Sequence, residues 1–483
     1  EAVTTGRFNV FVGNDAGLDI DTGGTNTALG HAALASDTKG EQSVAVGTGA
    51  LNAQNFTTAT NAFNTAVGRS AGLSLTTGVQ NTLMGATAGN TLGDSDYNVA
   101  IGYGALYTDV LGSKSTAIGV SALQNQTYGT TATDSHNVAI GYAAGLANVT
   151  GVQNVIIGST AGDARTSGDT NTIIGYQACG DGVGTGNQNT VVGGNAGLAL
   201  TSGFYNTYLG NNSGGANTVG LRNVAIGKGA LASDVNGSQN VAVGYNALNA
   251  QEASGSTSNN TLNTAVGSQA GAAMTTGYYN TIIGGIAGDA LQDGLENTFV
   301  GYGAGGASTD GDDNTAFGKE ALGSDTRGKR SVALGYKALQ NQDFTVADTI
   351  SYNTGVGYSS GNSVTTGVQN TFMGYYSGEA TTDADYNVAI GYNALSVNVL
   401  GSKSTAVGHN ALLFQRPVSG GSDTAADMHN TAVGYGAASQ ITTGKYNTAI
   451  GSLAGDAINT GEDNVAVGYG ALTTEDTGKN SVA

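Results

Sequence analysis

The sequence predicts an all-β protein, a parallel β-solenoid of about 26 coils with a 17-residue repeat. Anchors made of Asn or Ser, two further residues, an apolar residue and Gly occur 26 times between Asn9 and Gly468. Counted to the incomplete anchor at Ser481, 20 of the 26 spacings have this repeat length. Glycine supplies 80 of 483 residues, which disfavours helices. A short fixed period is typical of solenoids, and this one is too short for two helices and two turns.

The elements of one repeat follow from its residue types when the anchor Asn or Ser is numbered position 1. Positions 1–5, as in residues 64–68, alternate and favour β-branched residues, so they predict a strand. The glycine at position 5 predicts a corner with a positive φ or a close backbone approach. We expect a second strand at about positions 8–12. The Thr-Thr-Gly turn at positions 13–15, as in residues 76–78, then closes the coil.

Stacking of the coils places the same position of every repeat in one line. Position 1 is Asn in 22 and Ser in five of 27 anchors, so it predicts a ladder whose amides bond along the stack. The glycines at position 5 form a second line. Representative members of these structural ladders are Asn64, Asn81, Asn98, Gly68, Gly85 and Gly102.

The apolar core predicted for each coil is thin. Position 4 is apolar in all 26 anchors and position 8 is Ala in 23 of them, whereas positions 3, 9 and 10 are only partly apolar. We therefore expect position 4 to form the core, so that Ile101→Asp would bury a charge. Because a coil of two strands encloses only a slit, a single chain would expose much of one apolar face, and we expect self-association. Ala at position 8 suits a close approach at a shared axis.

The coils also repeat in groups of about four, and each group carries one long insertion. We expect the insertions to leave the coil at one edge and to contribute little to the ladder. Loops on a rigid scaffold often carry recognition, and neutral decoration or trimer-locking flaps are equally consistent with the sequence. The insertions span residues 52–63, 124–136, 249–262, 340–352 and 413–429, and the candidate recognition residues are Phe56, Tyr128, Phe344, Phe414 and Arg416.

Composition excludes several classes of partner. The chain has 35 acidic and 16 basic residues, a net charge of −19, which is the wrong sign for binding nucleic acid or an anionic membrane. The single cysteine, Cys179, excludes an intrachain disulfide and a multi-cysteine metal site. No apolar run approaches the ~18 residues of a membrane span.

Both ends stop inside a repeat, so we expect residues 1–483 to be one repetitive segment, truncated at both ends.

The residues that could carry chemistry favour a protein without catalytic residues or cofactors. None of the four histidines has metal-ligand spacing, and His31 and His409 fall at position 6, which predicts a surface location. The Gly-x-Ser-x-Gly string at residues 357–361 fills ordinary repeat positions. Acidic turns, as at Asp94 and Asp96, predict solvated turns, with weak calcium sites as the alternative.

Tyrosine occupies position 6 in 11 anchors. A row of exposed rings could stack on sugars. Packing of these rings over neighbouring coils, or over the next subunit, is the interpretation that we favour.

The anchors resemble known repeats. Residues 43–47, Ser-Val-Ala-Val-Gly, and 98–102, Asn-Val-Ala-Ile-Gly, are similar to the head repeats of trimeric autotransporter adhesins. The longer form, with Ala-Gly and Thr-Thr-Gly, also resembles the shafts of phage tail fibres. The resemblance covers the whole chain and implies a left-handed β-roll in which three chains pack side by side. The repeat is longer than in typical adhesin heads, and neck, stalk, membrane anchor and chaperone domain are missing from the segment.

We therefore expect a non-enzymatic, extracellular fibre segment, part of a phage tail fibre or of a bacterial surface adhesin. Its expected partners are two further copies of itself, in a homotrimer, and a cell-surface glycan or protein. The alternative is a carbohydrate-binding or depolymerising β-solenoid fibre, which would need a break in the repeat with paired carboxylates.

Overall fold

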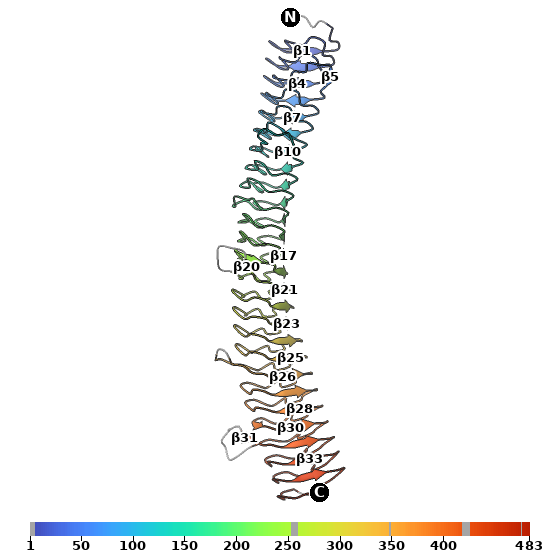
Figure 1. The fold of residues 1–483 in the computed structure, drawn as a ribbon, viewed down its shortest axis with the longest axis vertical. Coiled ribbons are helices and arrows are strands. Elements are labelled where there is room, and N and C mark those ends of the chain that lie inside the picture. The colour runs from blue at the N-terminus through green and yellow to red at the C-terminus, as the bar shows by residue number, and fades with distance from the viewer. Residues whose placement is uncertain (1–4, 253–258, 347–348, 418–425, 475) are drawn as a thin grey trace. The chain divides into compact units, whose positions relative to one another are not determined.

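The computed structural model describes residues 5–252, 259–346, 349–417, 426–474 and 476–483. It confirms an all-β, parallel β-solenoid of about 26 coils with the predicted repeat spacing, and the described residues contain no helix (Figure 1). The chain divides into two units, residues 1–239 with 254–259 and residues 240–253 with 260–483. Each unit is a stack of coils.

Each coil contributes one three-residue strand, at positions 2–4, to a parallel ladder. In the first unit these strands are β1 (Val10–Val12), β2 (Thr27–Leu29), β4 (Val44–Val46), β6 (Thr65–Val67), β7 (Thr82–Met84), β8 (Val99–Ile101), β10 (Thr116–Ile118), β12 (Val138–Ile140), β13 (Val155–Ile157), β14 (Thr172–Ile174), β15 (Thr190–Val192), β16 (Thr207–Leu209) and β17 (Val224–Ile226). In the second unit they are β19 (Val241–Val243), β21 (Thr264–Val266), β22 (Thr281–Ile283), β23 (Thr298–Val300), β24 (Thr315–Phe317), β25 (Val332–Leu334), β26 (Thr354–Val356), β27 (Thr371–Met373), β28 (Val388–Ile390), β30 (Thr405–Val407), β32 (Thr431–Val433), β33 (Thr448–Ile450) and β34 (Val465–Val467).

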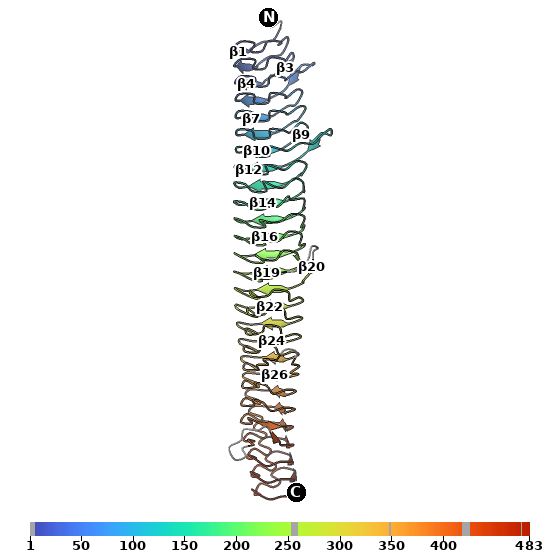
Figure 2. The ribbon, with the colours of Figure 1, turned by 90° about the vertical axis from the view of Figure 1, so that its left-hand side faces the viewer.

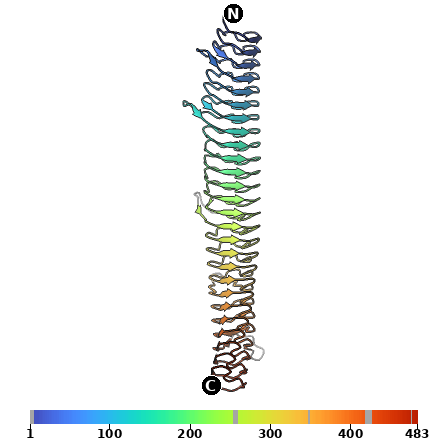
Figure 3. The ribbon, with the colours of Figure 1, turned by 90° about the vertical axis from the view of Figure 1, so that its right-hand side faces the viewer.

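Two-residue strands accompany the insertions. They are β3 (Gly40–Glu41), β5 (Thr60–Asn61), β9 (Gly112–Ser113), β11 (Thr133–Asp134), β18 (Gly237–Ser238), β20 (Asn259–Asn260), β29 (Gly401–Ser402) and β31 (Ala426–Asp427). β5, β11 and β31 belong to insertions and pair in parallel with β3, β9 and β29 of the coil before each insertion. In the first unit, the insertions near β3 and β9 project on the side opposite the main strands (Figures 2 and 3).

The core lies under position 3, and the prediction that position 4 forms it is wrong. Ala100 at position 3 is fully buried, whereas Ile101 at position 4 is only half-buried, and Leu29 and Phe317 at position 4 are 46% and 58% exposed. Side chains alternate along a strand, so the inward Asn at position 1 places position 3 inside and positions 2 and 4 outside. In a single chain, Ile101→Asp would therefore not bury a charge.

Residues at positions 3 and 9 compensate each other in volume. Where position 3 is Ala, as at Ala100, position 9 is often a buried Leu, such as Leu106. Where position 3 is aromatic, as at Phe372, position 9 is Gly; a Cβ on Gly378 would lie 2.4 Å from the Phe372 ring. Position 9 is also Gly in coils where position 3 is Ala, as at Ala66 and Gly72; there a Cβ on Gly72 would lie 2.7 Å from Leu83, at position 3 of the next coil, so neighbouring coils also set the available volume. Ala at position 8, such as Ala105, is buried within its own coil rather than at a shared axis.

The second strand expected at about positions 8–12 is absent from the described coils, which form turns there. Position 7 and position 9 have positive φ, 57° at Ser70 and 59° at Gly72, and these left-handed residues interrupt an extended strand. Hydrogen bonds between coils continue nevertheless, since Gly72 N donates to Ala88 O at 2.9 Å and Ser74 N donates to Asn90 O at 2.9 Å. This side of the coil is a ladder of turns.

The predicted corner at position 5 is confirmed, because the glycine there has both a positive φ and a close backbone neighbour. Gly68 has φ of 141°, and a Cβ there would lie 2.4 Å from the carbonyl oxygen of Gly85 in the next coil. A side chain at position 5 would meet both obstacles, the left-handed backbone and the adjacent glycine.

The asparagine ladder is also confirmed, and it does more than link the coils. Asn81 Oδ1 accepts the backbone N–H of Asn98 in the next coil at 2.9 Å, and the backbone N–H of Asn81 donates to Asn64 Oδ1 at 2.9 Å. Asn81 Nδ2 donates to the carbonyl oxygen of Ser95, fourteen residues on, at 2.8 Å. The buried amide therefore closes its own coil as well as joining it to its neighbours.

Each complete coil with Ser at position 1 contains Gln at position 12. The side-chain amide of this Gln makes some of the hydrogen bonds that the Asn amide at position 1 makes in the other coils. Gln126 Nε2 donates to Ser115 Oγ at 3.2 Å and to Asp109 Oδ2 at 2.6 Å. Gln126 Oε1 accepts Nδ2 of Asn137 in the next coil at 2.9 Å. The same cluster recurs with Ser331, Gln342 and Asp325 in the second unit. The Gln of this cluster is thus the third residue of its insertion in the four coils that begin with Ser, and this pairing was missed from the sequence.

Burial of the aspartates in these clusters predicts that the stability of the fold depends on pH. Loss of hydration raises the pKa of Asp109 and of Asp325 to about 6, from an ordinary 3.8. The folded state binds these protons more tightly than the unfolded state, so this contribution to stability is complete below about pH 4 and is lost as the pH rises to about 6. The loss is about 2–3 kcal/mol for each carboxyl.

We expect wild-type protein to melt at a lower temperature at pH 7 than at pH 5, and the double variant Asp109→Asn, Asp325→Asn to change less between these pH values. The chain already has Asn at the equivalent position of another coil, which indicates that Asn can replace Asp there. Asn398 Oδ1 accepts the backbone N–H of Gly401 at 3.0 Å, just as Asp109 Oδ1 accepts that of Gly112 at 2.9 Å. Thermal melts monitored by circular dichroism test this. An unchanged pH slope in the double variant would contradict the assignment.

Candidate functional site

Three of the five candidate recognition residues are inside the fold. Phe56, Tyr128 and Phe344 follow the buried Gln of their coils by two residues, and all three are buried. The Tyr128 hydroxyl donates to the carbonyl oxygen of Gly151 at 2.9 Å. These rings could contact a partner only if the coil opened. Their insertions also pair with the preceding coil, as does β31 of 413–429, so the expectation that the insertions contribute little to the ladder is wrong for 52–63, 124–136, 340–352 and 413–429.

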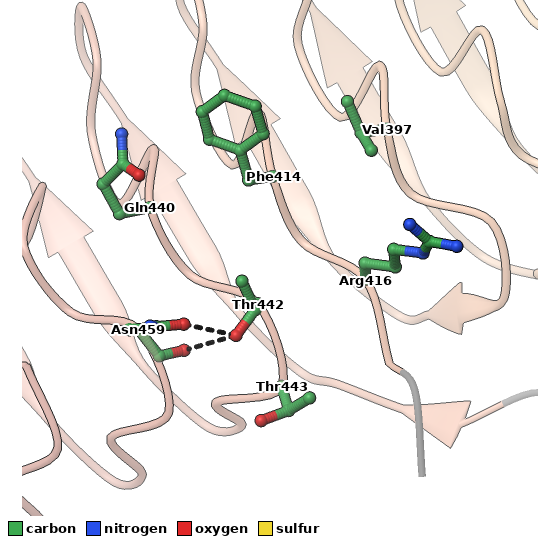
Figure 4. Close-up of a pocket in the computed structure, with 7 residues that line it drawn as sticks. All are labelled: Val397, Phe414, Arg416, Gln440, Thr442, Thr443 and Asn459. Carbon is green, nitrogen blue, oxygen red and sulfur yellow. Dashed lines mark hydrogen bonds between the residues drawn. The ribbon is translucent and has the colours of Figure 1, made fainter. Parts of the chain in front are cut away.

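Phe414 and Arg416 are the two candidates that the structure brings together at the surface. They occupy positions 11 and 13 of the coil that starts at Ser404, and Phe414 is 41% exposed. They line a groove of about 540 Å³ that crosses neighbouring coils of the second unit. The other lining residues are Val397, Gln440, Thr442, Thr443 and Asn459 (Figure 4).

The backbone beneath the groove is held by the ladder of turns. Phe414 N donates to Ser439 O at 3.1 Å, and Arg416 N donates to Thr442 O at 2.9 Å. The Thr442 hydroxyl donates to Asn459 Oδ1. These bonds fix the positions from which the Phe414 and Arg416 side chains project.

The side chains of the groove are suited to binding. Among the described residues, no carboxylate lies within ion-pair distance of Arg416, and the side chains of Gln440 and Thr443 have no hydrogen-bond partner. The groove thus offers a cation, an aromatic ring and free amide and hydroxyl groups. Its lining contains neither a carboxylate nor an imidazole for proton transfer.

The position-6 rings of the second unit form a stacked column. Neighbouring ring centroids are 4.8–5.5 Å apart and nearly parallel. The rings belong to Tyr336, Tyr358, Tyr375, Tyr392, His409 and Tyr435. Packing over neighbouring coils is confirmed for these residues, and because each inner ring covers its neighbours' faces, those faces cannot also stack on a sugar. His31 and His409 are exposed, as predicted.

Acidic turns make bonds between coils. Asp94 Oδ1 accepts the hydroxyls of Thr76 and Thr77 at 2.5 and 2.7 Å, and these bonds lower the pKa of Asp94. Asp96 Oδ1 accepts the backbone N–H of Val79 at 2.7 Å. Within the described ranges, no group of three His, Cys, Asp or Glu residues is arranged to hold a metal ion.

A buried arginine was missed from the sequence. Arg165 occupies position 12, a site that is Leu in several coils, and its Nη2 donates to the carbonyl oxygen of Gly186. Its Nη1 has no hydrogen-bond partner among the described residues, and burial lowers the pKa of the guanidinium. The nearby Cys179 is fully buried, which raises the pKa of its thiol to about 11, so this thiol is poorly reactive.

In the part of the chain that the structure describes, no helix is long and apolar enough to cross a membrane. Comparison with protein-family models found no match to the chain, and comparison with curated proteins found no significantly similar sequence.

Proposed function

We propose that this chain is a non-enzymatic structural and adhesive fibre segment. In this proposal three left-handed rolls associate side by side into a shaft or head that acts outside the cell in attachment to a cell surface. Both a phage tail fibre and a bacterial surface adhesin fit this role. The observation that carries the proposal is the outward apolar row at position 4.

That row has the properties of an interface. It is apolar in all 26 anchors although it points away from the coil, and position 2 beside it is always Thr or Val. The face therefore carries no charge, in a chain whose net charge is −19. In-register pairing extends the row along each unit, and soluble monomers rarely expose a contiguous apolar surface of this kind. A copy of the same face is a partner of matching shape and polarity.

Sedimentation of the intact chain tests the assembly. We expect a species of three times the 47.7 kDa chain mass at micromolar concentration. Replacing four successive position-4 residues with Asp is expected to shift the protein towards the monomer. These residues are Val67, Met84, Ile101 and Ile118.

The matched control places four aspartates at position 6 of the same coils, where the side chains also face outward. Its sites are Arg69, Ala86, Tyr103 and Val120. This control is expected to remain trimeric. A folded wild-type monomer, or equal dissociation of both variants, would overturn the assembly. Release of sugar from a host polysaccharide would instead favour a depolymerising fibre.

A further inference from the structure

The groove at Phe414 and Arg416 differs from the corresponding surface of every other insertion-bearing coil. In these five coils the residues at positions 11 and 13 make equivalent backbone bonds of 2.9–3.1 Å to the next coil. The other four pairs lack both an aromatic ring and a cation. They are Ala53 with Asn55, Asn125 with Thr127, Ala250 with Glu252, and Asn341 with Asp343.

The contacts of position 13 differ as well. In two of the other coils this residue accepts a bond from the preceding coil: Thr38 Oγ1 donates to Asn55 Oδ1 at 3.1 Å, and Thr326 Oγ1 donates to Asp343 Oδ1 at 2.8 Å. Before Arg416 the preceding residue is Val399, which has no side-chain donor or acceptor. The Arg416 guanidinium is therefore free of the structural bond that Asn55 and Asp343 make, as is the case at Thr127 and Glu252, which follow Val110 and Val235 one coil earlier.

From this arrangement we infer that the groove binds an anionic sugar residue, one that carries a carboxylate or a sulfate. A guanidinium presents paired donors that match either anion. The Phe414 ring offers an apolar surface to the carbon–hydrogen face of the sugar, next to Val397 (Figure 4). Gln440 and Thr443 can bond to sugar hydroxyls. The volume, about 540 Å³, is in the usual range for a small-molecule site.

The inference deepens the proposed function and rests on it for its biological setting, but the groove itself forms within one chain. A shallow site with one cation in a chain of net charge −19 binds weakly. Repetition of the groove around a trimer would add avidity on a polyanionic glycan. The structure thus assigns the groove to acidic surface polysaccharides rather than to neutral ones.

Binding of three matched monosaccharides to the full chain tests the site. Methyl β-glucuronide and methyl β-glucoside differ at C6, where the first has a carboxylate and the second a hydroxymethyl group, and methyl glucoside 6-sulfate supplies the other anion. Titrations followed by NMR are expected to show at least about tenfold tighter binding of both anionic sugars. Arg416→Gln is expected to remove this preference, and Phe414→Ala to weaken binding of all three probes.

The pair Asn125→Ala, Thr127→Gln is the control, because it alters the equivalent positions of another coil and should leave binding unchanged. Phe414 and Arg416 are exposed, so their variants should keep the wild-type melting temperature. Equal binding of glucuronide and glucoside, no binding of either, or unchanged binding by Arg416→Gln would overturn the inference. Sedimentation separates the two proposals: an intact trimer without sugar preference contradicts only the groove, and a sugar-binding monomer contradicts only the assembly.

Discussion

Ala100→Asp is expected to unfold its coil, at a cost of about 3–5 kcal/mol, because it places a carboxylate in a fully buried position without a partner. The effect should centre on β8 and its neighbours β7 and β10, since each coil of a repeat protein contacts mainly the coils on either side. Hydrogen exchange should show faster exchange in these strands, and limited proteolysis should cut there first.

Ile101→Asp is the matched comparison, one residue further along the same strand. Its side chain points outward, so hydrogen exchange within the coil should change little, and any effect should appear in the association of chains. Loss of protection in Ile101→Asp equal to that in Ala100→Asp would contradict the inward orientation of position 3.

Asn81→Leu is expected to cost about 4 kcal/mol, although the two side chains are similar in size. The substitution removes the donor to Ser95 O and the acceptor of Asn98 N, so two backbone groups lose the bonds that Asn81 supplies. Each such group costs about 1–3 kcal/mol. Thermal unfolding and local hydrogen exchange measure the loss.

Asn125→Leu controls for the change of side chain, because Asn125 is exposed and its amide makes no hydrogen bond with the described residues. It should leave the melting temperature nearly unchanged. Comparable destabilisation by both substitutions would show that the buried amide at position 1 has no special role in closing the coil.

The candidate site was only partly predictable. The insertions were identified because they break a regular spacing, and Phe414 and Arg416 among their residues do lie together at the surface. Phe56, Tyr128 and Phe344 belong to the same set by sequence but pack inside. One signal could have separated them: all three follow a Gln at position 12 by two residues, whereas Phe414 precedes such a Gln.

The repeat by itself determined the parallel stack, the asparagine ladder and the glycine corner. Stacking places identical residues above one another, so a recurring buried amide must form hydrogen bonds with the neighbouring coils, and a recurring glycine marks a position where no side chain fits. Only the tertiary structure decided which residues face inward. An apolar residue at position 4 suits a core and an interface equally well, and the choice depends on how the buried Asn at position 1 sets the alternation of the strand. Likewise, only the volumes brought together at positions 3 and 9 of a coil and of its neighbours show why glycines such as Gly378 and Gly72 have no room for a side chain.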